Sequence, residues 1–233
     1  MLVLDLFCGT KSVKKVCDKL GYSYIGLDID IYFEPDICID ILNWDYKTAY
    51  LKDEFKPDII WASPECKWYS KLTSSNKKYN WDEIEIGMGG GDKLVKRVLD
   101  IIDYFQPTKW FIENPFTGRL KNRLVMKGLN YYRTDYCCWA DWGYKKPTCI
   151  WTNIDWKVPL CDRRCNPRTC PSVIIDYNRP NTSQNLGYYY NHIKNLGGVK
   201  TELTTHHTTK GVKKQREDKY RIPEKLIESL FEN

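Results

Sequence analysis

The sequence predicts an open α/β fold with a mostly parallel β-sheet and a small irregular, basic appendage. First, short apolar segments of strand length alternate with segments of helical periodicity from the first residues onward. Second, glycine, proline or acidic residues directly follow several of these apolar segments, as they do at the carboxyl edge of an α/β sheet. Third, 233 residues with 42% hydrophobic composition suffice to bury a sizeable core. We therefore expect one α/β domain with an appendage at about residues 152–215.

The charge is divided unevenly along the chain. Residues 1–118 hold 15 Lys and Arg against 19 Asp and Glu, whereas residues 119–233 hold 21 against 11. The second part therefore accounts for the overall charge of +6. Such a basic region suits a polyanion, nucleic acid first, although a solvated basic surface without a partner would look the same.

The cysteines indicate a reducing compartment. The 10 cysteines are scattered and include the adjacent pair Cys137 and Cys138, unlike a disulfide framework. The sequence opens on an apolar strand at Leu2 rather than on a secretory leader, and no apolar run has the length of a membrane span. We expect an intracellular protein of the cytoplasm or nucleoid of a host cell, neither secreted nor bound to a membrane.

The first elements have the order of a nucleotide-type site. Leu2–Phe7 is predicted as a strand, Lys11–Leu20 as a helix and Tyr24–Leu27 as a second strand. Gly9 lies in the first turn, and Asp28 follows it by 19 positions at the tip of the second strand. A glycine lets a ligand approach the backbone, and an acid at this spacing accepts hydrogen bonds from ribose hydroxyls.

The turn lacks the further glycines of a dinucleotide-binding fingerprint. Lys11 and Ser12 stand where additional small residues would be expected. We therefore predict an adenosine ligand without a pyrophosphate.

The middle of the chain continues the alternation of strands and helices. We predict strands at Asp36–Ile41, Asp58–Ala62 and Trp110–Ile112, and helices at Trp44–Phe55 and from an N-cap at Asp92 to about Tyr104. Residues 71–91 include a glycine-rich run and lack strong periodicity. They are predicted to form a long loop, either a mobile lid or an insertion.

Two strands of this sheet end in residues suited to catalysis. Pro64, Glu65 and Cys66 follow one predicted strand, and Glu113 follows another. A thiol at the carboxyl edge of a sheet is a candidate nucleophile if Lys67 or nearby amides favour the thiolate, or else a half-buried structural cysteine. A carboxyl group across the same crevice would be a candidate proton donor, although an acid at a strand tip is more often simply solvated.

The last third contains a cluster of cysteines and arginines. Cys161, Cys165 and Cys170 with His206 are predicted as a three-cysteine, one-histidine zinc site, unless they are incidental thiols in a basic loop. Arg163 and Arg164 lie within this cluster, while Arg119 and Arg123 follow Glu113. These arginines are candidate contacts to phosphates or bases, or ordinary surface residues. A helix at Pro223–Phe231 is predicted to pack back on the sheet.

Taken together, these segments resemble the cytosine-5 DNA methyltransferases, most closely the short forms of phages and large DNA viruses. The matching segments occur in the family's order and span nearly the whole chain: Asp5–Thr10, Leu27–Ile29, Asp40, Ser63–Cys66, Glu113–Pro115, Tyr144–Asn153 and Tyr220–Glu224.

The resemblance implies a class I, Rossmann-like methyltransferase fold that uses S-adenosylmethionine. It implies that Cys66 is the nucleophile and that Glu113 stabilises the reacting cytosine. The implied cofactor-binding residues are Asp5, Phe7, Gly9, Thr10, Asp28, Ile29, Asp40 and Pro64. Lys145 and Lys146 are the cations nearest to the family's arginine-rich segment and are implied to contact nucleic acid.

The domains expected from this comparison are a catalytic core at 1–151, a basic target-recognition-like region at 152–215 and a C-terminal helix at 216–233 that returns to the core. The partner implied by the resemblance is double-stranded DNA with the target base flipped out, and the protein is expected to act as a monomer. RNA is the alternative substrate, because the chemistry of the base pocket does not distinguish the sugars. A catalytically weakened DNA-binding homologue is the other alternative, since Glu65 replaces a usual second proline and Lys11 and Ser12 replace glycines.

Overall fold

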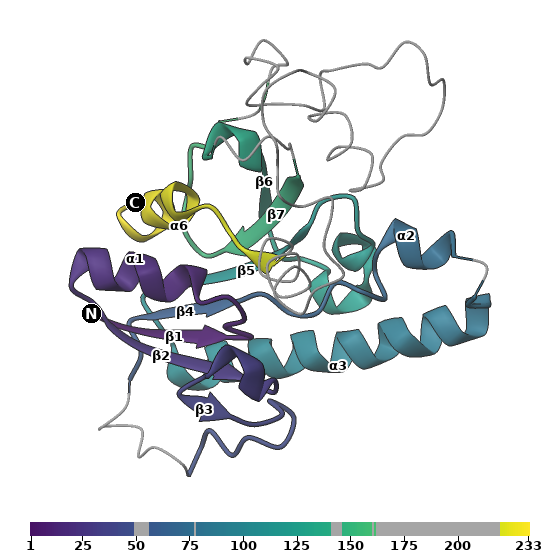
Figure 1. Cartoon of the computed structure of the whole chain (residues 1–233), viewed down its shortest axis with the longest axis horizontal. Helices are drawn as coiled ribbons and strands as arrows, with labels where there is room; N and C mark the ends of the chain where they lie inside the picture. Colours follow the sequence, from purple (N-terminus) through teal and green to yellow (C-terminus); the bar gives the residue numbers. More distant parts are fainter. Residues whose placement is uncertain (49–55, 77, 141–145, 160, 162–219) are drawn as a thin grey trace, which may run out of the picture.

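A computed structural model describes residues 1–48, 56–76, 78–140, 146–159, 161 and 220–233. Its centre is a seven-stranded sheet in the order β3-β2-β1-β4-β5-β7-β6 (Figure 1). The strands are β1 (Leu2–Leu6), β2 (Ser23–Asp28), β3 (Ile37–Cys38), β4 (Ile59–Ala62), β5 (Lys109–Pro115), β6 (Tyr131–Asp135) and β7 (Pro147–Thr152). The helices are α1 (Ser12–Leu20), α2 (Lys71–Ser74), α3 (Trp81–Phe105) and α6 (Glu224–Phe231), and short 3-10 turns are η1 (Ile31–Phe33), η2 (Leu120–Asn122), η3 (Leu124–Met126) and η4 (Tyr136–Cys138).

The sheet is mostly parallel, as predicted. β3, β2, β1, β4 and β5 run parallel to their neighbours, whereas β7 pairs antiparallel with both β5 and β6. The parallel strands are apolar because helices cover both sheet faces. The antiparallel β6–β7 pair was not predicted.

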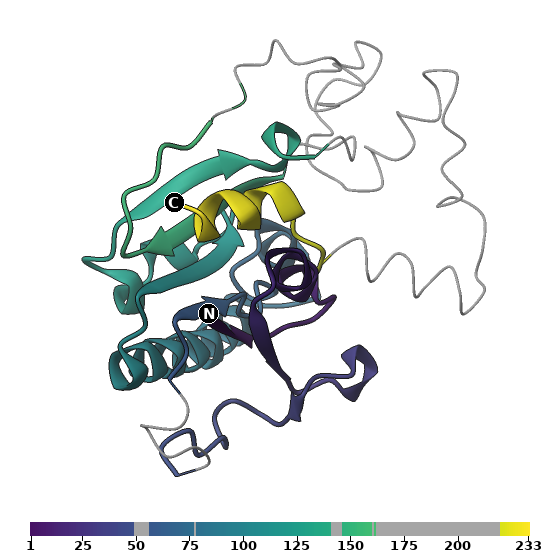
Figure 2. The same cartoon turned by 90° about the vertical axis from the view of Figure 1, so that its left-hand side faces the viewer.

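The two faces of the sheet have separate apolar cores. Leu4, Leu6 and Ile60 face α3, together with its buried residues Val95 and Val98. On the other face, Val3, Trp61 and Phe111 pack with α1 and α6. Figures 1 and 2 show the sheet between α3 on one side and α1 with α6 on the other. The predicted return of the C-terminal helix to the sheet is therefore confirmed.

The predicted loop at 71–91 is wrong. Most of it is helical, because α2 lies there and α3 begins at Trp81. Asn80 caps α3: its side chain accepts a hydrogen bond from the backbone amide of Glu83, and the Glu83 carboxylate accepts one from the backbone amide of Asn80. Asp92, predicted as an N-cap, lies inside this 25-residue helix.

The glycines of α3 are needed for packing against the chain after Cys66. A Cβ on Gly87 would lie 2.2 Å from the indole of Trp68, and one on Gly91 would lie 2.6 Å from the hydroxyl of Tyr69. A Cβ on Gly90 would meet nothing within 4 Å. The glycine-rich run is therefore a seat for two aromatic rings rather than a flexible lid.

The contact of Trp68 with Gly87 predicts an effect on stability, for which Gly90 is the matched control. Gly90→Ala is expected to raise the free energy of unfolding by about 0.5–1 kcal/mol, because glycine is a poor helix former. Gly87→Ala adds the same methyl group under Trp68 and is expected to lower the free energy of unfolding by about 1–3 kcal/mol through overpacking. Urea denaturation of both variants measures these changes, and equal stabilisation by both would contradict the packing role of Gly87.

Two further predictions near the edge of the sheet need correction. The strand predicted at Asp36–Ile41 is only Ile37–Cys38, because hydrogen-bonded pairing with β2 ends there. The described part of the helix predicted at Trp44–Phe55 forms turns instead, and Trp44 packs into the core below α3. Residues 49–55 lie outside the described part of the chain.

The division into domains stays a prediction. The sheet ends with β7 at Thr152, close to the predicted end of the core, but most of the region 152–215 lies outside the described residues. Within the residues that the structure describes, none of the helices combines the length and apolar character needed to cross a membrane.

Candidate active site

The predicted site residues gather at one edge of the sheet. In the parallel register, Leu6 of β1 lies beside Leu27 of β2 and Ala62 of β4, and Ala62 lies beside Ile112 of β5. The turn after β1, the tip of β2, the loop after β4 and Glu113 therefore share the carboxyl edge, where α/β folds bind ligands.

The turn after β1 has an unusual backbone. Phe7, Gly9 and Lys11 have positive φ angles of 64°, 46° and 57°. Its conformation is held by Asp28, whose Oδ2 accepts a hydrogen bond from the Gly9 amide at 2.9 Å while Oδ1 accepts from the Asp30 amide at 2.9 Å. The acid predicted to hold a ribose thus also shapes the glycine turn beside it.

The other predicted cofactor residues differ in exposure. Ile29, next to Asp28, is 66% exposed at the carboxyl edge. Asp40 accepts from the Leu42 amide at 2.9 Å, and the Thr10 hydroxyl lies 3.2 Å from that of Ser12. An exposed apolar side chain beside an acid and a glycine turn fits the adenosine part of S-adenosylmethionine.

Asp5 is buried below this turn. Its carboxyl group is on the α1 side of the sheet and accepts a hydrogen bond from the Tyr24 hydroxyl at 3.0 Å. Burial raises the pKa of Asp5 well above its ordinary value, and the nearby acids Asp28 and Asp36 act in the same direction. Its predicted contact with the cofactor stays a prediction, and its observed partner is Tyr24.

The raised pKa of Asp5 predicts a pH-dependent stability. The contribution of this carboxyl group to stability is fully present below its unfolded pKa of about 3.9 and is lost as the pH rises through its higher folded pKa. Relative to the wild type, Asp5→Asn should therefore be more stable at pH 8 than at pH 4.5, because asparagine has no charge to bury at the higher pH. Urea unfolding of both proteins at both pH values measures this, and a stability difference that does not change with pH would contradict it.

The loop that carries Cys66 is fixed to the segment that follows Glu113. The Asn114 side-chain amide donates to the carbonyl of Pro64 at 3.0 Å, and the Arg119 backbone amide donates to the carbonyl of Tyr69 at 3.0 Å. These two hydrogen bonds flank Cys66 on either side in the sequence. Cys66 is half-buried and forms no disulfide.

Tyr69 anchors the same loop to α3. The Tyr69 hydroxyl donates to Asp92 at 2.9 Å, and Asp92 is paired with the guanidinium of Arg123 at 2.7 Å. Arg123 also pairs with Glu85 at 2.8 Å, and the hydrogen bond that its guanidinium donates to Asp92 is the main cause that raises the pKa of Arg123. Sequence reasoning assigned Arg123 to nucleic acid, but its guanidinium is engaged inside the protein.

Glu113 is held by two hydroxyl groups. Its Oε1 accepts a hydrogen bond from Tyr136 at 3.1 Å and another from Thr148. Both donors come from segments at the ends of β6 and β7, and Glu113 is 6% exposed. Sequence reasoning did not identify Tyr136 or Thr148 individually.

The structure describes some of the remaining predicted cations and not others. The Arg119 guanidinium lies 4.6 Å from the exposed Trp81 ring, and the Lys146 ammonium lies 4.5 Å from the Tyr136 ring. The Lys67 ammonium, proposed as an activator of Cys66, lies 4.5 Å from the Trp68 ring. Lys145, Arg163 and Arg164 lie outside the described residues.

Most residues of the predicted zinc site lie outside the described part of the chain. Cys161 is described, whereas Cys165, Cys170 and His206 are not. Among the residues that are described, no group of three or more His, Cys, Asp or Glu side chains is arranged to hold a metal. The zinc site stays a prediction.

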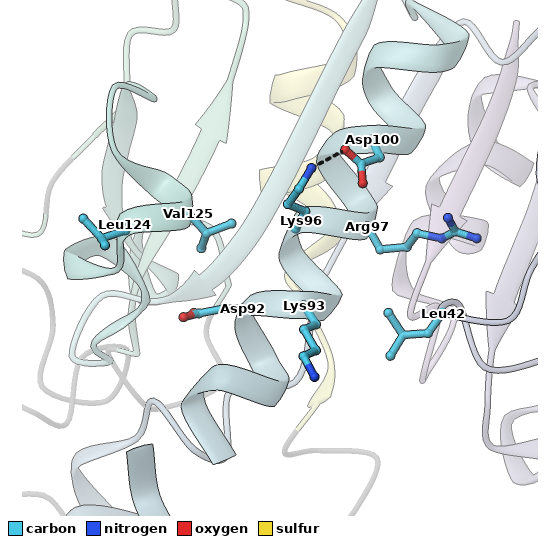
Figure 3. A pocket seen from close by; sticks show the side chains of 8 residues that line it. All are labelled: Leu42, Asp92, Lys93, Lys96, Arg97, Asp100, Leu124 and Val125. Carbon is cyan, nitrogen blue, oxygen red and sulfur yellow. Dashed lines mark hydrogen bonds and ion pairs between the residues drawn. The ribbon is translucent and has the colours of Figure 1, made fainter. Parts of the chain in front are cut away.

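A cavity of about 600 Å³ lies elsewhere, along the outer side of α3 (Figure 3). In Figure 3, Leu42 and the η3 residues Leu124 and Val125 lie on opposite sides of the helix. None of the predicted catalytic or cofactor residues lines this cavity. The site is therefore defined by the carboxyl edge of the sheet rather than by this hollow.

The order of seven strands, with β7 inserted antiparallel between β5 and β6, and the glycine turn with its facing acid define a class I methyltransferase. The chain is 38% identical over 182 residues to the probable DNA (cytosine-5)-methyltransferase of Frog virus 3 (isolate Goorha), a match that covers 74% of this chain and 79% of that protein. The chain therefore belongs to the DNA (cytosine-5)-methyltransferase family. No protein-family model matches it.

Two solved structures are similar at 13% identity. They are a methyltransferase encoded within an E. coli prophage, with a TM-score of 0.47 over 65% of this chain, and the S. pombe Dnmt2 methyltransferase, with a TM-score of 0.41 over 67%. The chain spans about half the length of each, 46% and 51% respectively.

Proposed function

We propose that this protein transfers a methyl group from S-adenosylmethionine to carbon 5 of cytosine in DNA. One observation carries the proposal: the Asn114 side chain joins the strand of Glu113 to the loop of Cys66 at Pro64, beside the turn that Asp28 holds. A candidate nucleophile, a candidate acid and a candidate adenosine site thus adjoin one another. Family membership supports the same reaction.

Each cofactor residue has a role that its position supports. Asp28 would accept hydrogen bonds from the ribose hydroxyls, and Ile29 would pack against the adenine. Asp40 would face the edge of the adenine, and the turn of Phe7, Gly9 and Thr10 would hold the rest of the ligand. When bound there, S-adenosylmethionine supplies an electrophilic methyl group.

Cys66 and Glu113 would make carbon 5 of cytosine reactive. The Cys66 thiolate adds to carbon 6, and the displaced electron pair moves through carbons 5 and 4 to nitrogen 3, which takes a proton from Glu113. Carbon 5 of the resulting enamine takes the methyl group. As carbon 5 takes the methyl group and S-adenosylhomocysteine is left behind, nitrogen 3 returns its proton to Glu113. Water then removes the carbon 5 proton, the electron pair of that bond forms the C5–C6 double bond, and the Cys66 thiolate leaves, which restores the aromatic ring.

The substrate base must leave its helix for this chemistry. Neither face of carbon 6 is accessible to a thiol within a stacked duplex, so we infer a flipped-out cytosine. Arg119 and Lys146, with the predicted Lys145, Arg163 and Arg164, would contact phosphates, and such binding weakens as salt increases. We propose a monomer as the active form.

The function is tested by bisulfite sequencing of DNA from cells that express the protein, together with transfer of a tritiated methyl group to purified DNA and RNA. The expected result is new 5-methylcytosine in DNA at a defined sequence and label in DNA only. Label in RNA only would assign the alternative substrate. Calorimetric binding of S-adenosylmethionine without transfer to either polymer would indicate a weakened, DNA-binding homologue.

A further inference from the structure

The hydroxyl groups of Tyr136 and Thr148 both donate hydrogen bonds to Glu113, and this affects how Glu113 can exchange a proton. We propose that Tyr136 and Thr148 are positioning residues that occupy Oε1 of Glu113 and so leave Oε2 as the atom that exchanges the proton with cytosine. This inference rests on the proposed function and deepens it. Neither Tyr136 nor Thr148 belongs to the segments that hold the nucleophile or the cofactor.

Both donors are placed rigidly. Thr148 is fully buried in β7, which pairs antiparallel with β5 so that Pro115 lies beside Thr148 and Glu113 beside Ile150. Tyr136 is 1% exposed in η4, directly after β6. The Tyr136 amide donates to the Lys146 carbonyl at 3.3 Å, which closes the segment between the two donors. Glu113 is therefore held by the β6–β7 pair rather than by β4 or by the loop of Cys66.

The hydrogen bonds differ between the two carboxyl oxygens. A carboxyl oxygen has two lone pairs, and at Oε1 both are used by hydroxyl donors. Thr148 also lies 3.1 Å from the Asn114 carbonyl, but a hydroxyl has one proton, and the closer and more strongly accepting partner is Glu113. Among the described residues, no hydrogen bond is made to Oε2. In the neutral acid the proton therefore belongs on Oε2.

The proton transfer then runs through a single atom. As the S–C6 bond forms, the Oε2–H bond breaks and an N3–H bond forms, and Glu113 becomes a carboxylate. Tyr136 and Thr148 donate to the charge that develops on this carboxylate without moving, so they stabilise it as a preorganised pair. The Lys146 ammonium over the Tyr136 ring adds a cation close to the same group.

Thr148 offers a test that separates hydrogen bonding from packing. Thr148→Val keeps the shape and removes the hydroxyl, whereas Thr148→Ser keeps the hydroxyl and removes a methyl group. We expect Thr148→Val to lower kcat about 10-fold with KM for DNA unchanged, and Thr148→Ser to stay within about 3-fold of the wild type. Tyr136→Phe should resemble Thr148→Val. A packing role predicts the reverse order for the two threonine variants.

Two readouts make the outcomes distinct. Methyl transfer reports the whole reaction, and release of tritium from carbon 5 of cytosine into water without cofactor reports addition of Cys66 with protonation of nitrogen 3. Both should fall together in Thr148→Val. If the wild type methylates DNA while Thr148→Val matches it, the positioning role is overturned. If the wild type methylates neither DNA nor RNA, the proposed function itself has failed.

Discussion

Cys66→Ala is expected to lower methyl transfer to DNA by about 10⁴-fold or more, because covalent addition to carbon 6 is what makes carbon 5 nucleophilic. Cys66→Ser should be nearly as inactive, because a hydroxyl is far less ionised than a thiol at neutral pH. Binding of S-adenosylmethionine should be unchanged in both variants, since neither substitution alters a predicted cofactor residue and most of these residues lie on β1, in the turn after it, at the tip of β2 and in the segment after β3. Rates with a tritiated methyl donor and calorimetry with the cofactor measure the two effects.

A modified substrate tests the covalent step directly. Fluorine at carbon 5 cannot leave as a proton does, so DNA containing 5-fluorocytosine should remain attached to the wild-type protein after denaturation. Cys66→Ala should form no such complex. Cys38→Ala, which changes an exposed cysteine on β3, is the matched control and should form the complex normally. Equal methyl incorporation by the wild type and Cys66→Ala would remove Cys66 from the mechanism.

Glu113→Gln is expected to lower kcat by about 10²–10³-fold. Glutamine has nearly the same shape and can still accept hydrogen bonds from Tyr136 and Thr148, but it has no acidic proton to give to nitrogen 3. The KM for the cofactor should change little, since β1 and β4 lie between β5, which carries Glu113, and β2. Steady-state kinetics with DNA of one sequence measures both parameters.

Glu65→Gln provides the control for this substitution. It makes the same chemical change on an exposed side chain next to Cys66 and is expected to stay within a few-fold of wild-type kcat. A similar large loss in both variants would show that the total charge near Cys66 matters rather than a specific acid. Unaltered activity in Glu113→Gln would exclude Glu113 as the proton donor.

The parallel part of the fold could be predicted because its signals are local. Strands β1, β4 and β5 are apolar runs ended by glycine, proline or acidic residues, and these ends identified Gly9, Cys66 and Glu113 as residues of one edge. The antiparallel β6 and β7 were missed because the charged and polar residues of β6 have no clear strand pattern. Their pairing depends on contacts with β5 rather than on local sequence.

The errors in the helices have a cause that lies outside the local sequence. Helix propensity argued against a helix through Gly87 and Gly91, but contact with Trp68 and Tyr69 decides their conformation. The ion pair between Arg123 and Asp92 was likewise not predicted, because the two residues are 31 positions apart in the sequence. Such partners become visible only when α3 has been placed against the sheet.

The seating of Trp68 and Tyr69 on α3 links the loop of Cys66 to a 25-residue helix whose buried residues belong to the core. Because Gly87 and Gly91 have no Cβ, the two rings lie directly against the α3 backbone, so the loop cannot swing outward without lifting both rings from the helix. A change that loosens or tightens the loop of Cys66 should therefore alter the rate of amide hydrogen exchange in the first turns of α3 in the same direction as in the loop.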